Sequence, residues 1–255
     1  MGKPGRYFWY ELMTSDLDAA EAFYTKVVGW NREDFGSPEM RYTVLKAGDR
    51  GVGGMMAMPE HCRGGEMPCF WGGYIEVADA DAEAAAIEAA GGKVHKAPDD
   101  IPGVGRFAVV ADPQGAMYNI LAPTGEDQPE LPARTPGTIG WHELYTSDEK
   151  AAFDFYSGRY GWREVTAMDM GPMGTYRIFG WDEAGNGGMM NHPQPGTPPG
   201  WLFYFCVEDI EAAAQRVRDG GGEVLMGPME VPDGGWIIQA NDPQGARFAL
   251  VGRKD

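Results

Sequence analysis

Long apolar runs, cysteines and basic residues are all scarce in this chain of 255 residues. No stretch of eighteen or more consecutive apolar residues occurs, so we expect no membrane-spanning helix. The first residues lead directly into a strand-like segment without the apolar core of a signal peptide, which favours a cytoplasmic protein. The three cysteines, Cys62, Cys69 and Cys206, follow no disulfide or metal spacing and suit a reducing compartment.

Basic residues are outnumbered by acidic ones, 21 against 38, which gives a formal net charge of −17. A chain this acidic repels phosphate backbones, and no basic cluster offsets the repulsion. The charge is typical of a solvated surface. We therefore expect a small-molecule ligand, no nucleic-acid or membrane partner, and either a monomer or a homodimer.

An internal repeat is the main feature that the chain does have. Residues 11–30, ELMTSDLDAAEAFYTKVVGW, return as residues 143–162, ELYTSDEKAAFDFYSGRYGW, at an offset of 132 residues. Each copy reads as a buried strand, a Ser-Asp pair that can cap a helix, and apolar residues at helical spacing. Gly29 and Gly161 can then take the left-handed conformation that ends a helix. One such unit is too small to fold alone, so the repeat predicts several units that fold together.

The rest of each half completes the same pattern twice. In the first half, the predicted strands are 7–13, 41–46, 52–58, 71–77, 93–96, 106–111 and 117–121, and the second predicted helix is 79–90. The turn Asp-Pro-Gln-Gly precedes the last strand at 112–115 and recurs at 242–245. The chain therefore reads as an α+β protein of four βαβββ modules. A proline-rich segment at 124–137 predicts a semi-extended linker between domains at 1–123 and 138–255.

This layout resembles the vicinal oxygen chelate superfamily, which contains glyoxalase I, bleomycin-resistance proteins, fosfomycin-resistance enzymes and extradiol dioxygenases. The resemblance is carried by TSDLDAAEAFYTKVVGW and its copy, by the helix before Ala90-Gly91-Gly92, and by the two Asp-Pro-Gln-Gly turns. The chain looks most similar to two-domain, glyoxalase-like members. The resemblance implies two fused domains, each an incomplete barrel-like mixed sheet with helices outside. It also implies that two paired modules form a cup that holds a divalent metal, and the sequence leaves open whether modules pair within one half or between halves.

The metal positions that the resemblance implies carry unsuitable side chains here. The first-strand positions are Trp9, Gly72, Trp141 and Leu202, the last-strand positions are Asn119 and Ala249, and Met56 and Met190 lie near the expected Glu. Indole has no available lone pair, and the metals of this superfamily are bound by His and carboxylate. We therefore expect no metal at the usual site and no other cofactor.

Strand alternation predicts which residues line the cup, because residues two apart face the same side. The inward set is Trp9, Glu11, Met13, Met56, Tyr74, Glu76 and Asn119 in the first half, and Trp141, Glu143, Tyr145, Met190, Tyr204, Cys206 and Arg247 in the second. The opposite parity, with Leu12, Ile75, Leu144 and Phe205, is apolar and suits packing under helices. An aromatic, methionine-lined cup with a few carboxylates suits a small organic ligand.

Glu11 and Glu143 are the candidate catalytic residues, because they recur at one place in both halves beside a tryptophan. Each is either a general base or hydroxyl acceptor, or a structural carboxylate bonded to backbone or to a tyrosine. The neighbouring Trp9 and Trp141 either stack on a flat ligand or fill the vacated metal position. His142 has the helix-facing parity of a buried structural histidine, whereas His192 near the cup mouth is the best candidate for a displaced metal ligand.

Three functions stay open at this point. The first is a metal-free protein that binds or transforms a small carbonyl or aromatic compound. The second is a metal-dependent glyoxalase-like lyase or dioxygenase that uses displaced ligands such as Glu76 or His192. The third is a protein that sequesters a small molecule without turnover, so the sequence leaves open whether the chain is an enzyme.

Overall fold

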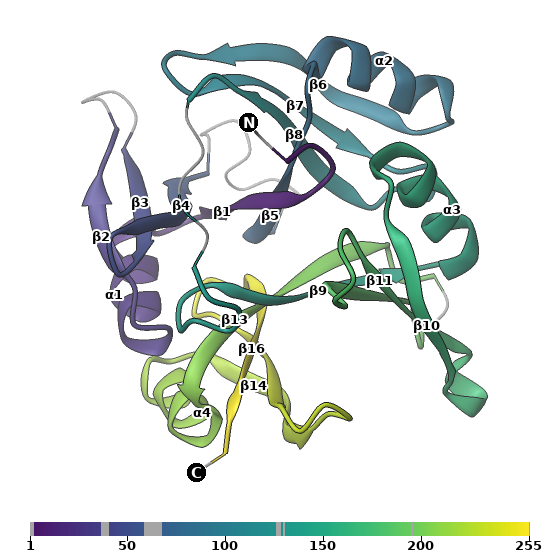
Figure 1. The fold of residues 1–255 in the computed structure, drawn as a ribbon. Coiled ribbons are helices and arrows are strands. Elements are labelled where there is room, and N and C mark those ends of the chain that lie inside the picture. Colours follow the sequence, from purple (N-terminus) through teal and green to yellow (C-terminus); the bar gives the residue numbers. More distant parts are fainter. Residues whose placement is uncertain are drawn as a thin grey trace. The chain divides into compact units, whose positions relative to one another are not determined.

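The computed structural model describes residues 3–36, 41–58, 68–125, 129, 131–194 and 196–254 (Figure 1). A loop is predicted from the sequence at 59–68, and its residues 59–67, which include His61 and Cys62, lie outside the described residues. The first half contains β1 (Tyr7–Thr14), α1 (Leu17–Val27), β2 (Asn31–Asp34), β3 (Tyr42–Ala47), β4 (Arg50–Ala57), β5 (Phe70–Glu76), α2 (Ala80–Ala89), β6 (Lys93–Ile101), β7 (Gly105–Ala111) and β8 (Met117–Pro123). The second half contains β9 (Ile139–Thr146), α3 (Glu149–Tyr160), β10 (Arg163–Asp169), a short 3-10 helix η2 (Gly171–Met173), β11 (Thr175–Gly180), β12 (Gly187–Asn191), β13 (Gly200–Asp209), α4 (Ile210–Asp219), β14 (Glu223–Glu230), β15 (Trp236–Asn241) and β16 (Arg247–Arg253).

The strands form two eight-stranded sheets with the same topology. Their orders are β2-β3-β4-β1-β5-β8-β7-β6 and β10-β11-β12-β9-β13-β16-β15-β14. The sheets are mixed, because β1–β4, β5–β8, β9–β12 and β13–β16 pair in parallel while hairpins such as β3–β4 and β15–β16 are antiparallel. Neither sheet closes into a barrel. The α+β class and the four βαβββ modules predicted from the sequence are confirmed.

The chain packs into two compact units that do not follow its two halves. The first unit comprises Met1–Phe8, Gly72–Pro129 and His142–Trp201, and the second comprises Trp9–Trp71, Glu130–Trp141 and Leu202–Asp255. The first unit therefore holds most of the second and third modules, and the second unit holds most of the first and fourth. The domain boundaries 1–123 and 138–255, which follow the sequence repeat, stay a prediction.

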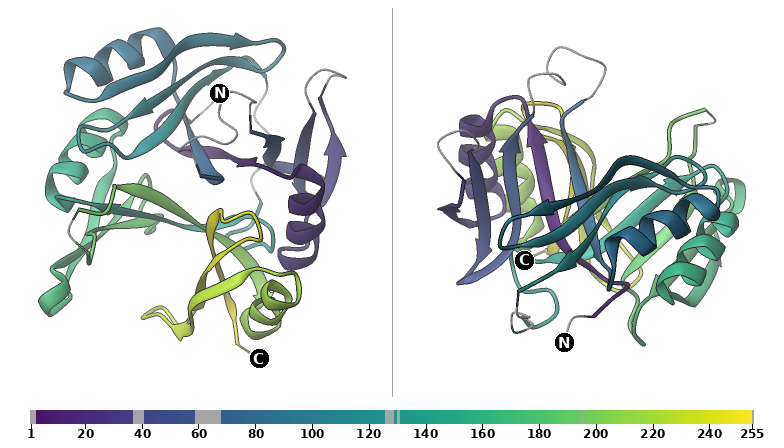
Figure 2. Two further views of the ribbon diagram at one scale, coloured as in Figure 1. Left: turned by 180° about the vertical axis from the view of Figure 1, so that it is seen from behind. Right: turned by 90° about the horizontal axis from the view of Figure 1, so that it is seen from above.

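The helices begin and end where the sequence predicts. Asp16 caps α1 by accepting a hydrogen bond from the Ala19 N–H at 3.0 Å, and Gly29 has a φ of +87° just beyond its end. In the second unit, α1 lies against α4, which covers β14, β15 and β16 (Figure 2). In the first unit, α2 covers β6, β7 and β8 (Figure 1). Among the described residues, no helix is both apolar enough and long enough to cross a membrane.

The two Asp-Pro-Gln-Gly turns have a packing role that the sequence analysis did not predict. One carboxylate oxygen of Asp112 accepts from the N–H groups of Gln114 and Ala116, both at 2.9 Å, and the other accepts from the Tyr156 hydroxyl at 3.2 Å. In the second unit, Asp242 makes the same turn and accepts from the Tyr24 hydroxyl at 3.0 Å. Each turn thus fastens its last strand to the helix of another module.

Two details of the sequence analysis are corrected. The edge strands β2 and β10 were not predicted, because every residue of β2 and nearly every residue of β10 is exposed and carries no alternating pattern. The segment 132–138 forms consecutive turns and is not semi-extended, since the hydroxyls of Thr135 and Thr138 bond back to the carbonyls of Pro132 and Thr135, each at 2.7 Å.

Candidate functional site

The first strand of the first module presents its predicted residues on one side of the sheet. Trp9 and Met13 are half-buried and Glu11 is 8% exposed, while Leu12 on the opposite side is fully buried. The register pairs Glu11 with Gly54 and Met13 with Met56. The third module repeats this arrangement in the first unit: Glu143, 7% exposed, pairs with Gly188, and Tyr145 pairs with Met190.

Each of these glutamates is hydrogen-bonded to a tyrosine from two strands away. In the first unit, the Tyr176 hydroxyl on β11 donates to Glu143 Oε1 on β9 at 2.9 Å. In the second unit, the Tyr42 hydroxyl on β3 bonds to Glu11 on β1 and accepts from Trp9 Nε1 at 2.9 Å. We call Glu11–Tyr42 and Glu143–Tyr176 the Glu–Tyr pairs.

A glycine on the intervening strand makes each pair possible. Neighbouring strands lie about 4.8 Å apart, so a tyrosine on β3 must cross β4 to reach a carboxylate on β1. A Cβ added at Gly54 would lie 2.1 Å from the Tyr42 hydroxyl oxygen, and one added at Gly188 would lie 2.2 Å from Cζ of Tyr176. The second glycine of the repeated Gly-Gly-Met-Met sequence is therefore the space that the tyrosine ring occupies.

The electrostatics keep the tyrosine of the second unit protonated. Burial raises the pKa of Tyr42, and the charge of the adjacent Glu11 raises this pKa further. The hydroxyl therefore remains a hydrogen-bond donor to the carboxylate over the physiological pH range. A carboxylate accepts several hydrogen bonds, so one bond from tyrosine orients the group and leaves it able to accept a ligand hydroxyl or a proton.

The alternatives for these residues are narrowed by these contacts. The sequence analysis offered a hydrogen bond to a tyrosine as the structural role of Glu11 and Glu143, and both bonds are present. Such a bond orients the carboxylate, which keeps its ability to accept a proton. The Trp9 indole N–H is engaged by Tyr42, so Trp9 is part of the second-unit pair. Stacking of Trp9 or of the half-buried Trp141 on a ligand stays a prediction.

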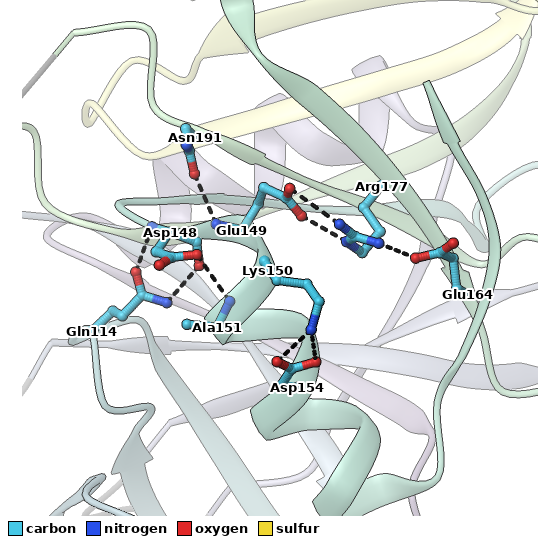
Figure 3. A network of polar contacts seen from close by, with 9 residues as sticks. All are labelled: Gln114, Asp148, Glu149, Lys150, Ala151, Asp154, Glu164, Arg177 and Asn191. Carbon is cyan, nitrogen blue, oxygen red and sulfur yellow. Dashed lines mark hydrogen bonds and ion pairs between the residues drawn. The ribbon is translucent and has the colours of Figure 1, made fainter. Parts of the chain in front are cut away.

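An ion-pair network around Arg177 (Figure 3) anchors the strand that carries Tyr176. Because Arg177 follows Tyr176 directly on β11, its side chain lies on the opposite side of the sheet. Arg177, next to Tyr176 on β11, donates from Nε to Glu149 at the start of α3 at 2.6 Å and also pairs with Glu164. The N–H of Glu149 donates to the Asn191 side chain at 2.8 Å. These contacts fix β11 and β12 against α3 and thereby fix the side of the sheet on which Tyr176 lies.

The second module places its predicted residues within the first unit. Tyr74 and Glu76 on β5 are 5% and 8% exposed, and Tyr74 lies beside Asn119 of β8 in the ladder. Glu76 also exchanges backbone hydrogen bonds with Gly5 and Arg6, at 2.8 and 2.9 Å. The predicted ligand-binding roles of these side chains stay predictions.

The fourth module carries a chain of polar groups in the second unit. Arg247 donates to Gln239 Oε1 at 2.6 Å, and Gln239 Nε2 donates to the Tyr204 hydroxyl at 2.8 Å. This bond passes over Ala249, which pairs with both Gln239 and Tyr204 and has no side chain large enough to obstruct it. Cys206 is 2% exposed and burial raises the pKa of its thiol, which makes it a poor nucleophile.

The two histidines singled out from the sequence differ in their surroundings. His142 is 4% exposed, stacks on Tyr7 at 5.0 Å, and its Nδ1 donates to the Asn186 carbonyl at 2.8 Å, as predicted for a structural histidine. Burial lowers its pKa to about 4, so it is neutral at physiological pH. His192 packs on Tyr145 at 5.5 Å, and its Nδ1 accepts from the Gln194 N–H at 3.1 Å. The hydrogen of a neutral His192 ring therefore sits on Nε2, which does not suit metal ligation.

The family resemblance implies a divalent metal, but the side chains at the implied ligand positions do not suit one. Trp9 uses its only polar group toward Tyr42, and Gly72, Leu202 and Ala249 have no donor atom. Within the described part of the chain, no group of three or more His, Cys, Asp and Glu residues is placed to hold a metal ion.

The sequence comparisons assign the chain to a family. The model of the Glyoxalase/Bleomycin resistance protein/Dioxygenase superfamily matches residues 6–120 and again residues 138–250. The chain therefore belongs to this superfamily, and the resemblance drawn from the repeated motifs is confirmed.

Two named relatives align along nearly the whole chain. It is 33% identical over 245 residues to "Putative glyoxylase CFP32" of Mycobacterium tuberculosis, which covers 95% of this chain and 93% of that protein. It is 31% identical over 268 residues to the anthracycline biosynthesis protein DnrV of Streptomyces peucetius, which covers 97% of this chain and 93% of that protein.

Solved structures share the fold at low sequence identity. The Mn(II)-bound glyoxalase from Novosphingobium aromaticivorans matches with a TM-score of 0.68 and 17% identity, over 100% of this chain and 84% of that one. The 2,3-dioxygenase LapB from Pseudomonas sp. KL28 matches with a TM-score of 0.69 and 16% identity, over 100% and 94%. At these identities the likeness shows the fold alone.

Several site residues were missed by the sequence analysis. Tyr42 was placed only within the predicted strand 41–46, and neither Tyr176 nor Gln239 was singled out. A signal was present, because both tyrosines stand 31 or 33 residues after their glutamate and twelve residues before the paired glycine. The role of the second glycine as the space that the tyrosine ring occupies depends on strand order, which sequence spacing does not reveal.

Proposed function

We propose that this protein binds a small carbonyl or aromatic compound and acts on it by acid–base chemistry that depends on the Glu–Tyr pairs, without the usual metal. The observation that carries the proposal is that each unit contains one Glu–Tyr pair with a glycine beneath the tyrosine ring. Glutamate, tyrosine and glycine form the same buried arrangement twice, which favours a functional role over simple filling of the space of the usual metal.

In this proposal, the glutamate is the general base and the tyrosine is a positioning residue. The carboxylate takes a proton from a ligand hydroxyl or from a carbon next to a carbonyl, and returns a proton later in the cycle. The tyrosine hydroxyl holds the carboxylate in one orientation, which lowers the cost of reaching the reactive geometry. The surrounding Met56 and Met190, and the aromatic residues beside them, supply apolar contact for the ligand.

The names of the relatives support this class of ligand. One relative is named a glyoxylase, which is consistent with a small carbonyl compound, and another is named for anthracycline biosynthesis, which is consistent with an aromatic one. We also infer a cytoplasmic monomer or homodimer that engages neither nucleic acid nor a membrane, in line with its net charge of −17.

The test uses 2-hydroxyacetophenone, which joins an aromatic ring to a carbonyl with exchangeable α-hydrogens. In D2O, a general base speeds the exchange of these hydrogens, which NMR follows directly. Wild-type protein is expected to accelerate exchange, and the double variant Glu11→Gln with Glu143→Gln to lose about 100-fold or more of that rate. The matched control is Glu88→Gln on α2, whose side chain is exposed.

The outcomes separate the proposed functions. Exchange that survives the double variant unchanged would show that the glutamates are not the base. Binding of the compound without any acceleration would instead identify a protein that sequesters its ligand.

The metal is tested on the same material. We expect protein purified without chelator or nickel affinity resin to contain no stoichiometric transition metal by elemental mass spectrometry. We also expect the exchange rate to be unchanged by EDTA and by added Mn²⁺ or Ni²⁺. A rate that falls with EDTA and returns with one ion would contradict the metal-free proposal and favour a lyase or dioxygenase with displaced ligands.

A further inference from the structure

The fourth module differs from the second at three neighbouring positions on one face of the sheet. The polar residues are Gln239, Asn241 and Arg247, and the residues at the same places in the second module, 130 positions earlier, are Val109, Ala111 and Met117. The register is the same in both: Arg247 pairs with Asn241 as Met117 pairs with Ala111. An apolar patch in one copy is therefore a polar, cationic patch in the other.

This patch lies on the side of the sheet opposite the helix. Phe248 and Leu250, which alternate with Arg247 and Ala249, are fully buried on the α4 side. The patch thus shares the face of Tyr204, which the sequence analysis predicts to line the ligand cup.

Arg247 is held in place by buried groups that carry no charge, so its positive charge is not balanced by them. Its guanidinium donates to Gln239, which is 3% exposed and is itself bonded to Tyr204, 2% exposed. Among the described residues, Arg247 forms no ion pair, and neither does the exposed Arg218 of α4, whereas Arg32, Arg106, Arg134, Arg159 and Arg177 each pair with a carboxylate. An exposed guanidinium that is oriented by an amide and left without a carboxylate keeps its remaining donors for an anion.

We propose that Arg247, supported by Gln239 and joined by Asn241, is the binding site for the carboxylate of a small organic ligand. The inference rests on the proposed function, since it takes this face of the sheet to be a small-molecule surface. It adds that the fourth module selects an anionic ligand, while its apolar counterpart in the second module does not.

The experiment compares benzoate with benzamide, which have similar shapes and differ in charge. Their dissociation constants are measured by ligand-detected NMR at low salt on wild-type protein, on Arg247→Met and on Arg218→Met. Methionine is the residue at the matching place in the second module. Arg218 lies exposed on α4 of the same unit, so the control removes the same charge away from the patch.

We expect wild-type protein to bind benzoate about tenfold more tightly than benzamide, as one charge-assisted contact allows. Arg247→Met should lose this preference with benzamide affinity unchanged, Arg218→Met should keep it, and added salt should weaken it. Equal affinities for both probes in wild type, or equal effects of the two variants, would overturn the anion site and leave the proposed function standing. Failure of benzoate to bind wild-type protein would likewise overturn the anion site, whereas only the exchange assay decides the proposed function.

Discussion

His142 and Tyr10 occupy the same place in the two sequence repeats but meet different surroundings. In the second unit, Tyr10 packs edge-on against Phe203 at 5.2 Å. In the first unit, His142 stacks on Tyr7 and bonds to the Asn186 carbonyl, and burial lowers its pKa from 6.5 to about 4. The folded state therefore takes up a proton at His142 less readily than the unfolded state does.

The linkage gives a definite sign for the pH dependence. Because the folded pKa lies below the unfolded one, the contribution of neutral His142 to stability is complete above about pH 6.5 and is lost as the pH falls to about 4. The loss is about 1.4 kcal/mol per pH unit and about 3 kcal/mol in all. Urea unfolding at several pH values should show this slope in wild type and not in His142→Gln, which keeps a donor for Asn186. Parallel curves would mean that His142 does not titrate on unfolding in this range.

Tyrosine hydroxyls in the Glu–Tyr pairs should matter more for activity than other buried hydroxyls. Tyr42→Phe and Tyr176→Phe remove the bond that orients each glutamate, so the exchange rate should fall about tenfold or more, with a stability loss of about 1 kcal/mol. Tyr118→Phe is the control, because its hydroxyl bonds to Tyr160 at 2.9 Å inside the first unit. It should cost similar stability and no activity. Equal loss of activity in all three variants would point to a general structural effect.

At the scale of the strands, the Glu–Tyr pairs depend on Gly54 and Gly188. A methyl group at either position would overlap the tyrosine ring, so Gly54→Ala and Gly188→Ala should displace the tyrosine and destabilise the protein by about 1–3 kcal/mol. Gly158→Ala is the control, because a Cβ there meets nothing within 4 Å and Gly158 lies inside α3. It should stabilise by about 0.5–1 kcal/mol. Thermal unfolding and the exchange assay test both statements, and an active, stable Gly54→Ala protein would contradict the account of the pair.

The turns before the last strands offer a second comparison between equivalent positions. The Gln114 side chain accepts from the Asp148 N–H at 2.6 Å and donates to its carbonyl at 2.8 Å, whereas Gln244 Oε1 is buried with no hydrogen-bond partner among the described residues. Gln114→Met should therefore destabilise by about 1–2 kcal/mol, and Gln244→Met should be neutral or stabilising. Denaturant unfolding of the two variants decides the point. Equal losses would show that the bonds of Gln114 add no net stability.

The sequence predicted the elements with strong periodicity and missed those without it. The alternation along β1 correctly placed Leu12 on the face that packs under helices and Glu11 on the opposite face, because the two faces of the strand meet different surroundings. No such contrast marks the edge strand β2. The tyrosine bonds escaped prediction because Tyr42 and Glu11 meet across an intervening strand, and sequence spacing does not reveal strand order. Arg247 was recognised by parity, but its support by Gln239 depends on the antiparallel register of β15 with β16.

At the scale of the whole chain, each compact unit is built from both halves of the sequence. In the second unit, Trp30 packs on Phe205 with ring centroids 4.8 Å apart, and Phe23 packs on Phe248 at 5.9 Å. In the first unit, Arg159 pairs with Glu83, and Trp162 Nε1 donates to the Gly5 carbonyl at 2.6 Å. The repeat in the sequence thus matches the repeated sheet topology, while the packed cores join modules from different halves.

Cutting the chain at residue 129 tests this organisation. The piece 1–129 would lose the packing of α1 against α4 and the bond from Tyr24 to Asp242, which buried aromatic rings surround. We expect it alone to aggregate or to pair with a second copy of itself, because it retains only half of each compact unit. Mixing it with the piece 130–255 should restore a one-to-one complex that unfolds cooperatively, as measured by light scattering and circular dichroism. A monomeric piece 1–129 with a cooperative unfolding transition of its own would contradict the division into these units, because it would place a self-sufficient core within one half of the sequence.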